Sequence, residues 1–383
     1  MQQEAYWVWL QQGLGYASHK LNDILSLFHD AQAFYHAGIQ QWRLSGLFTN
    51  KELSRLEKNT LEEAQRVVLR CKNLGQEIVT PQTPSYPQQL LQLPNPPAVL
   101  YVKGSMPNWE QAVSLAIVGT RSATPYGLDV AFQFACQLAK AGVVIVSGGA
   151  LGVDGAAHRG ALQAGGVTVA VLGCGINYGY LYENASLRET IAISGALVSE
   201  YPPDTPPTRY SFPVRNRLIS GLALGTLVVE AGERSGSLIT ANLALEQNRD
   251  VFAVPGNVNS SVSDGTNNLI KAGATAVTKP EDILAEYLLR YPRRLSVQDN
   301  NQQAMEAAPS IAGGETLTAT AAATLALSDA GKTVYHALEK TPVQLADLAL
   351  RVDLAPQAMM GALTELELAG LVNALPGKRY QKV

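Results

Sequence analysis

Basic residues, glycines and serines gather in four short segments between residues 119 and 241. These segments read GTRSATPYG (119–127), SGGALGVDGAAH (147–158), FPVRNRLISG (212–221) and EAGERSGSLITA (230–241). Guanidinium groups, hydroxyls and the N–H groups that glycine leaves accessible are the donors that bind phosphate oxygens. The chemistry that suits these residue types is therefore the binding of an anion, with phosphate as the natural ligand.

The first two segments hold compact sets of donors. Gly119 permits close approach of the backbone, and Arg121 and Ser122 can donate hydrogen bonds to one oxygen. Gly148 and Gly149 open the second segment, where successive N–H groups can curl around a phosphate. We expect both segments to contact the ligand.

The third segment places two arginines on either side of an asparagine. On a helix, Arg215 and Arg217 would point in directions that differ by roughly 200°. They can serve one ligand if one of them lies in the preceding turn, or if they hold successive phosphates. A chain of phosphates suits this spacing better than a mononucleotide, and Asn216 adds a donor and an acceptor for a sugar or a base edge.

The remaining candidates are single polar residues near the starts of helices. Ser235 and Gly236 begin a helical stretch, where the serine can cap the helix or donate to an anion. Asp154 stands near the start of another helix and can cap it instead of touching the ligand. Further along, a segment rich in glycine and asparagine contributes one cation, Lys271.

Strands and helices alternate around these segments. The runs AVSLAIVG, VVIVSGG, VTVAVLG, GALVSE and GTLVVEA are apolar without polar alternation, as in strands that helices cover on both faces. The stretches FQFACQLAKAG (132–142) and ANLALEQNR (241–249) show helical spacing of apolar residues. This pattern predicts a doubly wound α/β fold with a mostly parallel sheet, in which the strand ends bring the four segments to one crevice.

Composition narrows the possible partners. The 383 residues leave room for two or three domains, and the formal charge of −3 means that any polyanion site must be local. The three cysteines form no close pair, and no histidine or carboxylate cluster suggests a metal or another cofactor. The first residues lack a signal-peptide pattern and no apolar run reaches 18 residues, so we expect a cytoplasmic protein without a membrane partner.

The chain divides into four parts by composition and periodicity. The expected parts are a helical domain (1–75), an α/β domain (76–289), a flexible polar linker (290–327) and a winged-helix domain (328–383). Within the α/β domain, the apolar AVLYV follows a proline-rich stretch and is predicted to be an edge strand.

Both terminal domains leave their roles open. In the first, Gly13 and Gly15 precede a helix, which is compatible with a helix-hairpin-helix unit that approaches DNA, although a packing domain is the favoured interpretation. In the last, the third helix carries Glu365 and Glu367 but no lysine or arginine, and only the wing is basic. A role in protein interaction is therefore favoured over duplex recognition.

Six strings, taken in order, resemble those of the DNA-processing protein A family (DprA, also called Smf). They are GTRSATPYG, SGGALGVDGAAHRGAL, AVLGCGINYGYLY, FPVRNRLISGLA, VVEAGERSGSLITANLALEQNRDVFAVPG and SDGTNNLIKAGA, and the resemblance is strong over about 80–290. It implies an extended Rossmann-like domain that binds single-stranded DNA, forms a homodimer and hands the strand to the RecA recombinase during natural transformation. One departure is Tyr180-Leu181-Tyr182, where the family often has Tyr-Pro.

The resemblance also implies roles for individual residues. The family's DNA pocket corresponds to Arg121, Ser122, Gly148, Gly149, Arg215, Asn216 and Arg217, bordered by Ser235 and Gly236. Its dimer surface, which overlaps the RecA contact, corresponds to Leu245, Asn267 and Ala276.

A non-catalytic binder is the leading functional hypothesis, because no segment supplies a nucleophile with an adjacent base. The alternative is a Rossmann-class hydrolase that releases the base from a nucleoside monophosphate. In that case Arg121 would act together with Glu230 or Glu233.

Overall fold

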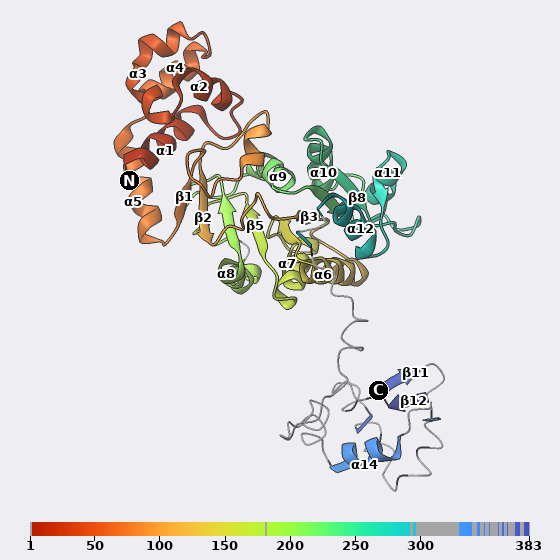
Figure 1. Cartoon of the computed structure of the whole chain (residues 1–383). Coiled ribbons are helices and arrows are strands. Elements are labelled where there is room, and N and C mark those ends of the chain that lie inside the picture. The colour runs from red at the N-terminus through yellow and green to blue at the C-terminus, as the bar shows by residue number, and fades with distance from the viewer. Residues whose placement is uncertain are drawn as a thin grey trace. The chain divides into compact units, whose positions relative to one another are not determined.

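The structure is a computed structural model, and the chain forms two compact units, residues 1–298 and 299–383. It describes residues 2–180, 182–291, 294–295, 329–338, 343–344, 348, 352, 359, 362–363, 366, 372–375 and 379–382. The first unit contains a group of helices followed by an α/β sheet (Figure 1).

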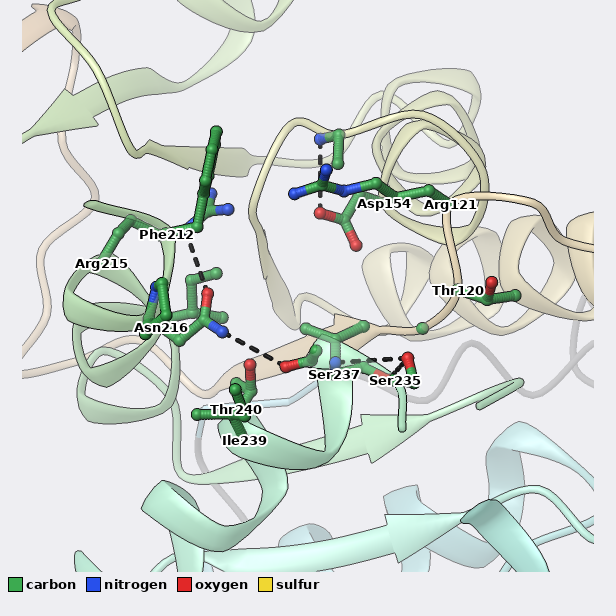
Figure 2. A pocket seen from close by; sticks show the side chains of 16 residues that line it. Thr120, Arg121, Asp154, Phe212, Arg215, Asn216, Ser235, Ser237, Ile239 and Thr240 are labelled. Carbon is green, nitrogen blue, oxygen red and sulfur yellow. Dashed lines mark hydrogen bonds between the residues drawn. The ribbon is translucent and has the colours of Figure 1, made fainter. Parts of the chain in front are cut away.

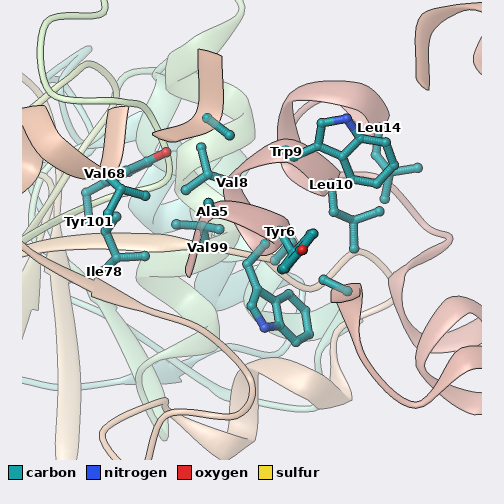
Figure 3. Close-up of a cluster of buried hydrophobic side chains, with 14 of the residues drawn as sticks. Ala5, Tyr6, Val8, Trp9, Leu10, Leu14, Val68, Ile78, Val99 and Tyr101 are labelled. Carbon is teal, nitrogen blue, oxygen red and sulfur yellow. The ribbon is translucent and has the colours of Figure 1, made fainter. Parts of the chain in front are cut away.

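The first helices are α1 (Gln2–Leu14), α2 (Leu21–Phe28), α3 (Ala31–Leu44), α4 (Asn50–Lys58) and α5 (Leu61–Asn73). Their apolar faces share a core with the start of the sheet, where α1 and α5 pack on the strands β1 (Glu77–Val79) and β2 (Leu100–Gly104) (Figure 3). Gly13 lies in the last turn of α1, and a Cβ there would come 2.5 Å from Leu56 Cδ2 of α4. The structure thus uses Gly13 for close helix packing.

The central sheet contains nine strands within the described residues, in the order β1-β2-β6-β5-β4-β3-β7-β8-β9. The strands after β2 are β3 (Ser114–Val118), β4 (Val144–Ser147), β5 (Thr168–Leu172), β6 (Ala196–Ser199), β7 (Gly225–Val228), β8 (Asp250–Ala253) and β9 (Thr275–Ala276). From β6 to β9 all neighbours pair in parallel, whereas β2 is antiparallel to both β1 and β6. The predicted doubly wound, mostly parallel sheet is confirmed.

One detail of the sheet differs from expectation. AVLYV contributes to β2, but β2 is not at the edge, because β1 pairs with its outer side through Ile78 opposite Tyr101. The short β1 was hidden in a proline-rich segment, and its three residues give too little periodicity to detect. The edge strand is therefore β1.

Helices cover both faces of the sheet. They are α6 (Pro125–Lys140), α7 (Val153–Gln163), α8 (Ala185–Ser194), α9 (Ser211–Gly221), α10 (Gly236–Glu246), α11 (Asp264–Lys271) and α12 (Pro280–Arg290), with the short 3-10 helices η1 (Gln88–Gln92) and η2 (Tyr182–Asn184). On one face, η1, α9, α10 and α11 pack on Val118, Val146 and Val228. On the other, α6, α7 and α12 pack on Leu115, Ile117 and Ile145. The central strands β3, β4 and β7 are therefore covered by apolar packing on both faces.

The second unit contains a small antiparallel sheet. The described elements are α14 (Asp329–Ala337), β10 (Val343–Gln344), β11 (Val372–Leu375) and β12 (Arg379–Lys382), with the strands in the order β10-β12-β11. Val334, Leu338 and Leu366 belong to its core. The hairpin of β11 and β12 is where a wing was expected, while Glu365, Glu367 and the linker beyond residue 295 lie outside the described residues.

Candidate functional site

A cavity of about 430 Å³ opens at the carboxyl ends of the central strands (Figure 2). Because β4 follows β3 on one side and β7 lies on its other side, the chain reverses its winding direction at β3. Crevices form at such switch points, where successive loops turn away from each other. All four segments singled out in the sequence contribute to this cavity, which is lined by Gly119, Thr120, Arg121, Ala150, Asp154, Phe212, Arg215, Asn216, Ser235, Gly236, Ser237 and Thr240.

The third segment is helical throughout, so neither arginine lies in a preceding turn. Helix α9 spans Ser211–Gly221, so Arg215, Asn216 and Arg217 all lie within it. The connection from β6 runs instead through residues 200–210, where prolines keep the chain extended. Helical spacing therefore decides which of the arginines reaches the cavity.

Arg215 is held in place by backbone carbonyl oxygens. Its Nη1 donates to Gly148 O at 2.6 Å and also to Val171 O, and its Nε donates to Asn216 Oδ1 at 3.2 Å. Burial lowers the pKa of this guanidinium, whereas the nearby Asp154 carboxylate opposes that shift. With these donors engaged, Arg215 gives the wall of the cavity a fixed positive charge.

Gly148 lies close to Arg215 and Asp154, two charged residues that line the cavity. A Cβ on Gly148 would lie 2.5 Å from Arg215 Nη1 and 2.7 Å from Asp154 Oδ2, so a side chain there would displace one of these charged groups. Asp154 is buried and accepts a hydrogen bond from Ala150 N at 3.3 Å. Burial raises the pKa of its carboxyl, with Arg215 acting in the opposite direction. The cavity lining thus includes the positive charge of Arg215 next to the carboxyl group of Asp154.

Phe212 brings the cavity an aromatic face beside two cations. The guanidinium carbon of Arg121 lies 5.1 Å from the centre of the Phe212 ring, and that of Arg215 lies 6.0 Å away. Arg121 is exposed, so its side chain can change conformation when a ligand binds. Arg215 is buried and held by hydrogen bonds, so its side chain is fixed. An arginine over an aromatic ring can both bind a phosphate and sandwich a flat group against the ring.

The start of α10 supplies further donors. Ser235 is the N-cap and accepts from Ser237 N at 3.4 Å, and the two hydroxyl oxygens are 2.8 Å apart. Asn216 Nδ2 donates to Gly236 O at 3.4 Å and so ties α9 to this helix. Unpaired N–H groups at a helix start favour an anion, and the position of a Cβ on Gly236 is open space.

Five predicted nucleic-acid residues do not line this cavity. Gly148 and Gly149 line a smaller hollow beside it, and Ser122, Arg217 and Lys271 lie elsewhere. Arg217 turns away on α9, where its Nη2 lies 2.8 Å from Glu200 Oε1, and both side chains are only 3% exposed. Ser122 is exposed but Thr120 lines the cavity in its place. Lys271 lies on α11 and lines a different cavity, of about 350 Å³, with Asn267 and Ala276.

The partner-surface candidates lie on α10, α11 and β9. Asn267 exchanges hydrogen bonds with Gly256 at 3.1 Å through both its amide oxygen and its amide nitrogen. Leu245 is 55% exposed near the end of α10. The structure thus groups Asn267 with Ala276 and Lys271, and leaves Leu245 as an exposed apolar side chain on a neighbouring helix.

The carboxylates of the hydrolase alternative are placed differently. Glu230 is buried, where it accepts from Thr124 N at 2.9 Å and from Thr124 Oγ1 at 2.5 Å. Thr124 in turn caps α6 by accepting from Gly127 N at 3.1 Å. Glu233 is exposed, and neither glutamate is among the described residues that line the cavity.

Sequence reasoning missed Phe212 as a site residue. The signal was present, because Phe212 precedes Arg215 by three residues and positions three apart lie on one face of a helix. The prediction considered only the polar residues Arg215, Asn216 and Arg217 of this segment. Ser237 and Thr240, one turn apart at the start of α10, also line the cavity.

Two kinds of feature are not found in the described part of the chain. It has no group of three or more histidine, cysteine, aspartate or glutamate residues that could hold a metal ion. Nor does it have a helix that is both long and apolar enough to span a membrane.

Comparison with known proteins gives consistent matches. The family model of DNA recombination-mediator protein A matches residues 77–288, and that of the DprA winged helix domain matches residues 318–378. Protein Smf of Escherichia coli is 40% identical over 299 residues, which cover 76% of this chain and 74% of that protein.

Two solved structures are also similar. DNA processing protein A from Streptococcus pneumoniae superposes with a TM-score of 0.58 at 36% identity, covering 64% of this chain and 84% of that one. DNA processing protein A from Helicobacter pylori, whose structure concerns its single-stranded DNA binding mode, gives a TM-score of 0.51 at 34% identity, covering 56% of this chain and 97% of that one.

Proposed function

Because the chain belongs to the DNA recombination-mediator protein A family, we propose that it binds single-stranded DNA in the cavity at the strand ends. The observation that carries this proposal is the stacking of Arg121 on Phe212 beside the start of α10. A base can rest against the aromatic face while neighbouring phosphates meet the guanidinium and the helix N–H groups. A paired base cannot reach such a cavity, so the proposed ligand is unpaired DNA.

Arg121 and Arg215 have different parts in this proposal. Arg121 is exposed and contacts phosphate directly, whereas Arg215 is fixed by carbonyl oxygens and supports the site as a static charge. Gly148 belongs to the site because it allows Arg215 and Asp154 to approach, and Gly149 follows it with a positive φ of 66°. Ser235, Gly236 and Asn216 complete the proposed contacts.

The proposal extends to partners and domain limits. The bound strand would pass to the RecA recombinase in the cytoplasm, and the chain would act as a homodimer through Leu245, Asn267 and Ala276. The helical part would span 1–75, the DNA-binding part 76–289, the linker 290–327 and the winged helix 328–383. Support comes from the family match over both folded parts.

A direct test compares the binding of single-stranded and duplex oligonucleotides by fluorescence anisotropy. The single strand should bind more tightly, and its affinity should fall with salt by a slope of about 0.7 for each phosphate contacted. Arg121→Ala should weaken it about 10- to 100-fold, as expected for the loss of charge-assisted hydrogen bonds. Arg43→Ala, which removes an exposed arginine from α3, is the matched control. Equal affinity for single strand and duplex would contradict the proposal.

We also propose that the protein acts by binding and not by catalysis. Glu230 supports this view because its carboxylate oxygens accept hydrogen bonds from Thr124 at the start of α6. Incubation with the four nucleoside monophosphates should release no free base by chromatography. Base release that Glu230→Gln abolishes, with the protein still folded, would favour the hydrolase alternative.

A further inference from the structure

Three tyrosines follow β5 in a segment that borders the cavity. Tyr182 is 80% exposed and Tyr178 is 39% exposed, while the Tyr180 ring lies 5.7 Å from the ring of Phe212. We call Tyr178, Tyr180 and Tyr182 the tyrosine track. Exposed apolar side chains that lie close together mark interaction sites, and aromatic rings among them can stack on the bases of a single strand.

The tyrosine track is anchored to the glycine loop of the cavity. Asn184 is buried, and its Nδ2 donates to Gly149 O at 3.2 Å and to Ala150 O at 3.0 Å. At the other end, Asn177 Nδ2 donates to Asp204 Oδ1 at 2.6 Å. These bonds hold the backbone on either side of the tyrosines, and of the three rings Tyr180 lines the smaller hollow next to the main cavity.

Basic groups continue from the cavity toward these rings. A smaller hollow adjoins the main cavity and shares Arg121, Phe212 and Arg215 with it. Tyr180 and Arg188 also line this hollow and do not line the main cavity. A polyanion that leaves the main cavity past Phe212 therefore meets another guanidinium and an aromatic ring, which is the alternation that suits successive nucleotides.

We infer that the tyrosine track binds the nucleotides next to those held in the main cavity, with bases stacked on Tyr178 and Tyr182 and a phosphate beside Arg188. This inference rests on the proposed function and extends it. It commits to one ligand, the continuation of the same single strand. A duplex does not fit, because its bases are already stacked on each other and cannot lie on the tyrosine rings.

The decisive variable is the length of the oligonucleotide. Oligothymidines from about 4 to about 16 nucleotides should bind more tightly as they reach the tyrosine track. Tyr182→Ala should weaken binding of the long oligonucleotide about tenfold and leave the short one unchanged. Tyr182→Phe, which keeps the ring, should retain nearly all of the affinity. Leu44→Ala is the control for surface exposure, since Leu44 is 78% exposed on α3.

Abasic nucleotides separate stacking from charge. If the tyrosine rings bind bases, an abasic flank should weaken wild-type binding by the same factor as Tyr182→Ala, and combining the two should add little. Unchanged affinity of Tyr182→Ala for the long strand, or equal weakening for short and long strands, would overturn the inference. Failure of the wild-type protein to bind either strand would instead overturn the proposed function.

Discussion

Two arginines on one helix have opposite surroundings because of their spacing. Arg215 and Arg217 differ in direction by roughly 200° on α9, so one faces the cavity and the other faces the interior. Arg215 meets carbonyl oxygens and an aromatic ring, whereas Arg217 meets the carboxylate of Glu200. At the scale of the residue, the same side chain lines the cavity at position 215 and forms a buried ion pair at position 217.

The first prediction concerns Arg217. Its removal should reduce stability, because Glu200 would keep a buried charge without a partner; such losses amount to about 3–5 kcal/mol. Urea unfolding of Arg217→Ala would measure this effect. The family resemblance had instead placed Arg217 in the DNA pocket.

A double variant provides the control. Glu200→Gln combined with Arg217→Met removes both charges and should recover part of the lost stability. The folded fraction of each variant should still bind single-stranded DNA. If Arg217→Ala unfolds at the wild-type urea concentration but no longer binds DNA, then Arg217 belongs to the binding site after all.

Asp154 predicts how DNA binding depends on pH. Burial raises the pKa of its carboxyl, so protonation begins above the ordinary value of about 3.9 as the pH falls. Loss of that negative charge beside the bound phosphates should tighten binding by on the order of 1 kcal/mol. Anisotropy titrations at successively lower pH should show binding tighten as this carboxyl takes up its proton. Asp154→Asn should bind more tightly at pH 7 and lose this dependence, whereas an unchanged profile would argue against the role.

At the scale of the element, strands were easier to predict than the ends of helices. The five apolar runs became β3 to β7, because a strand covered on both faces needs continuous apolar residues. The start of α9 could not be placed from the sequence, because the apolar spacing that marks a helix becomes visible only at Leu218 and Ile219. The proline-rich residues 202–207 indicate the loop that connects β6 to α9.

Helix α7 carries a buried histidine with consequences for stability. Thr168 Oγ1 donates to Ile145 O at 2.8 Å, so it accepts from His158 Nδ1, which lies 2.7 Å away. The other ring nitrogen, Nε2, is buried without a protein partner. Burial, together with the nearby arginines 159 and 215, lowers the pKa of His158 to about 3. The neutral ring is therefore part of the packing between α7 and β5.

The sign of the resulting pH effect follows from linkage. The pKa of His158 is lower in the folded than in the unfolded state, where it is about 6.5, so the unfolded state binds more protons between these values. Its contribution is complete above pH 6.5 and is lost as the pH falls, by about 2 kcal/mol at pH 5. Urea unfolding at pH 6.5 and pH 5 should show a lower free energy of unfolding at pH 5. The His158→Gln variant should show a smaller difference between the two pH values. Equal pH dependence in the two proteins would contradict this assignment.

At the scale of the whole molecule, the sequence predicted the architecture but not the relations between distant parts. The sheet, its helical cover and the two flanking folds follow from local patterns. That Asn216 ties α9 to α10, or that Tyr101 packs with the first helix, depends on contacts that no local pattern contains. For the same reason, Lys271 was grouped with the DNA residues although α11 places it beside Asn267.

The final prediction concerns assembly. Leu245 is 55% exposed on α10, and Val258 is 83% exposed beside the cavity that contains Asn267 and Ala276. If this surface joins two copies, Leu245→Arg should place two unpaired charges in the interface and yield a monomer by size exclusion with light scattering. Leu44→Arg, on exposed α3, is the control and should remain a dimer.

Assembly should also change how a long strand is bound. Two cavities on one dimer can hold the same strand, and the second contact then forms at a high effective concentration. The monomeric Leu245→Arg variant should therefore match the wild type on a short oligonucleotide but bind a long one more weakly, with faster dissociation. Equal weakening on both lengths would mean that Leu245 affects the cavity itself, because α10 begins there with Ser235 and Gly236. Comparing the two lengths thus separates the role of the interface from that of the site.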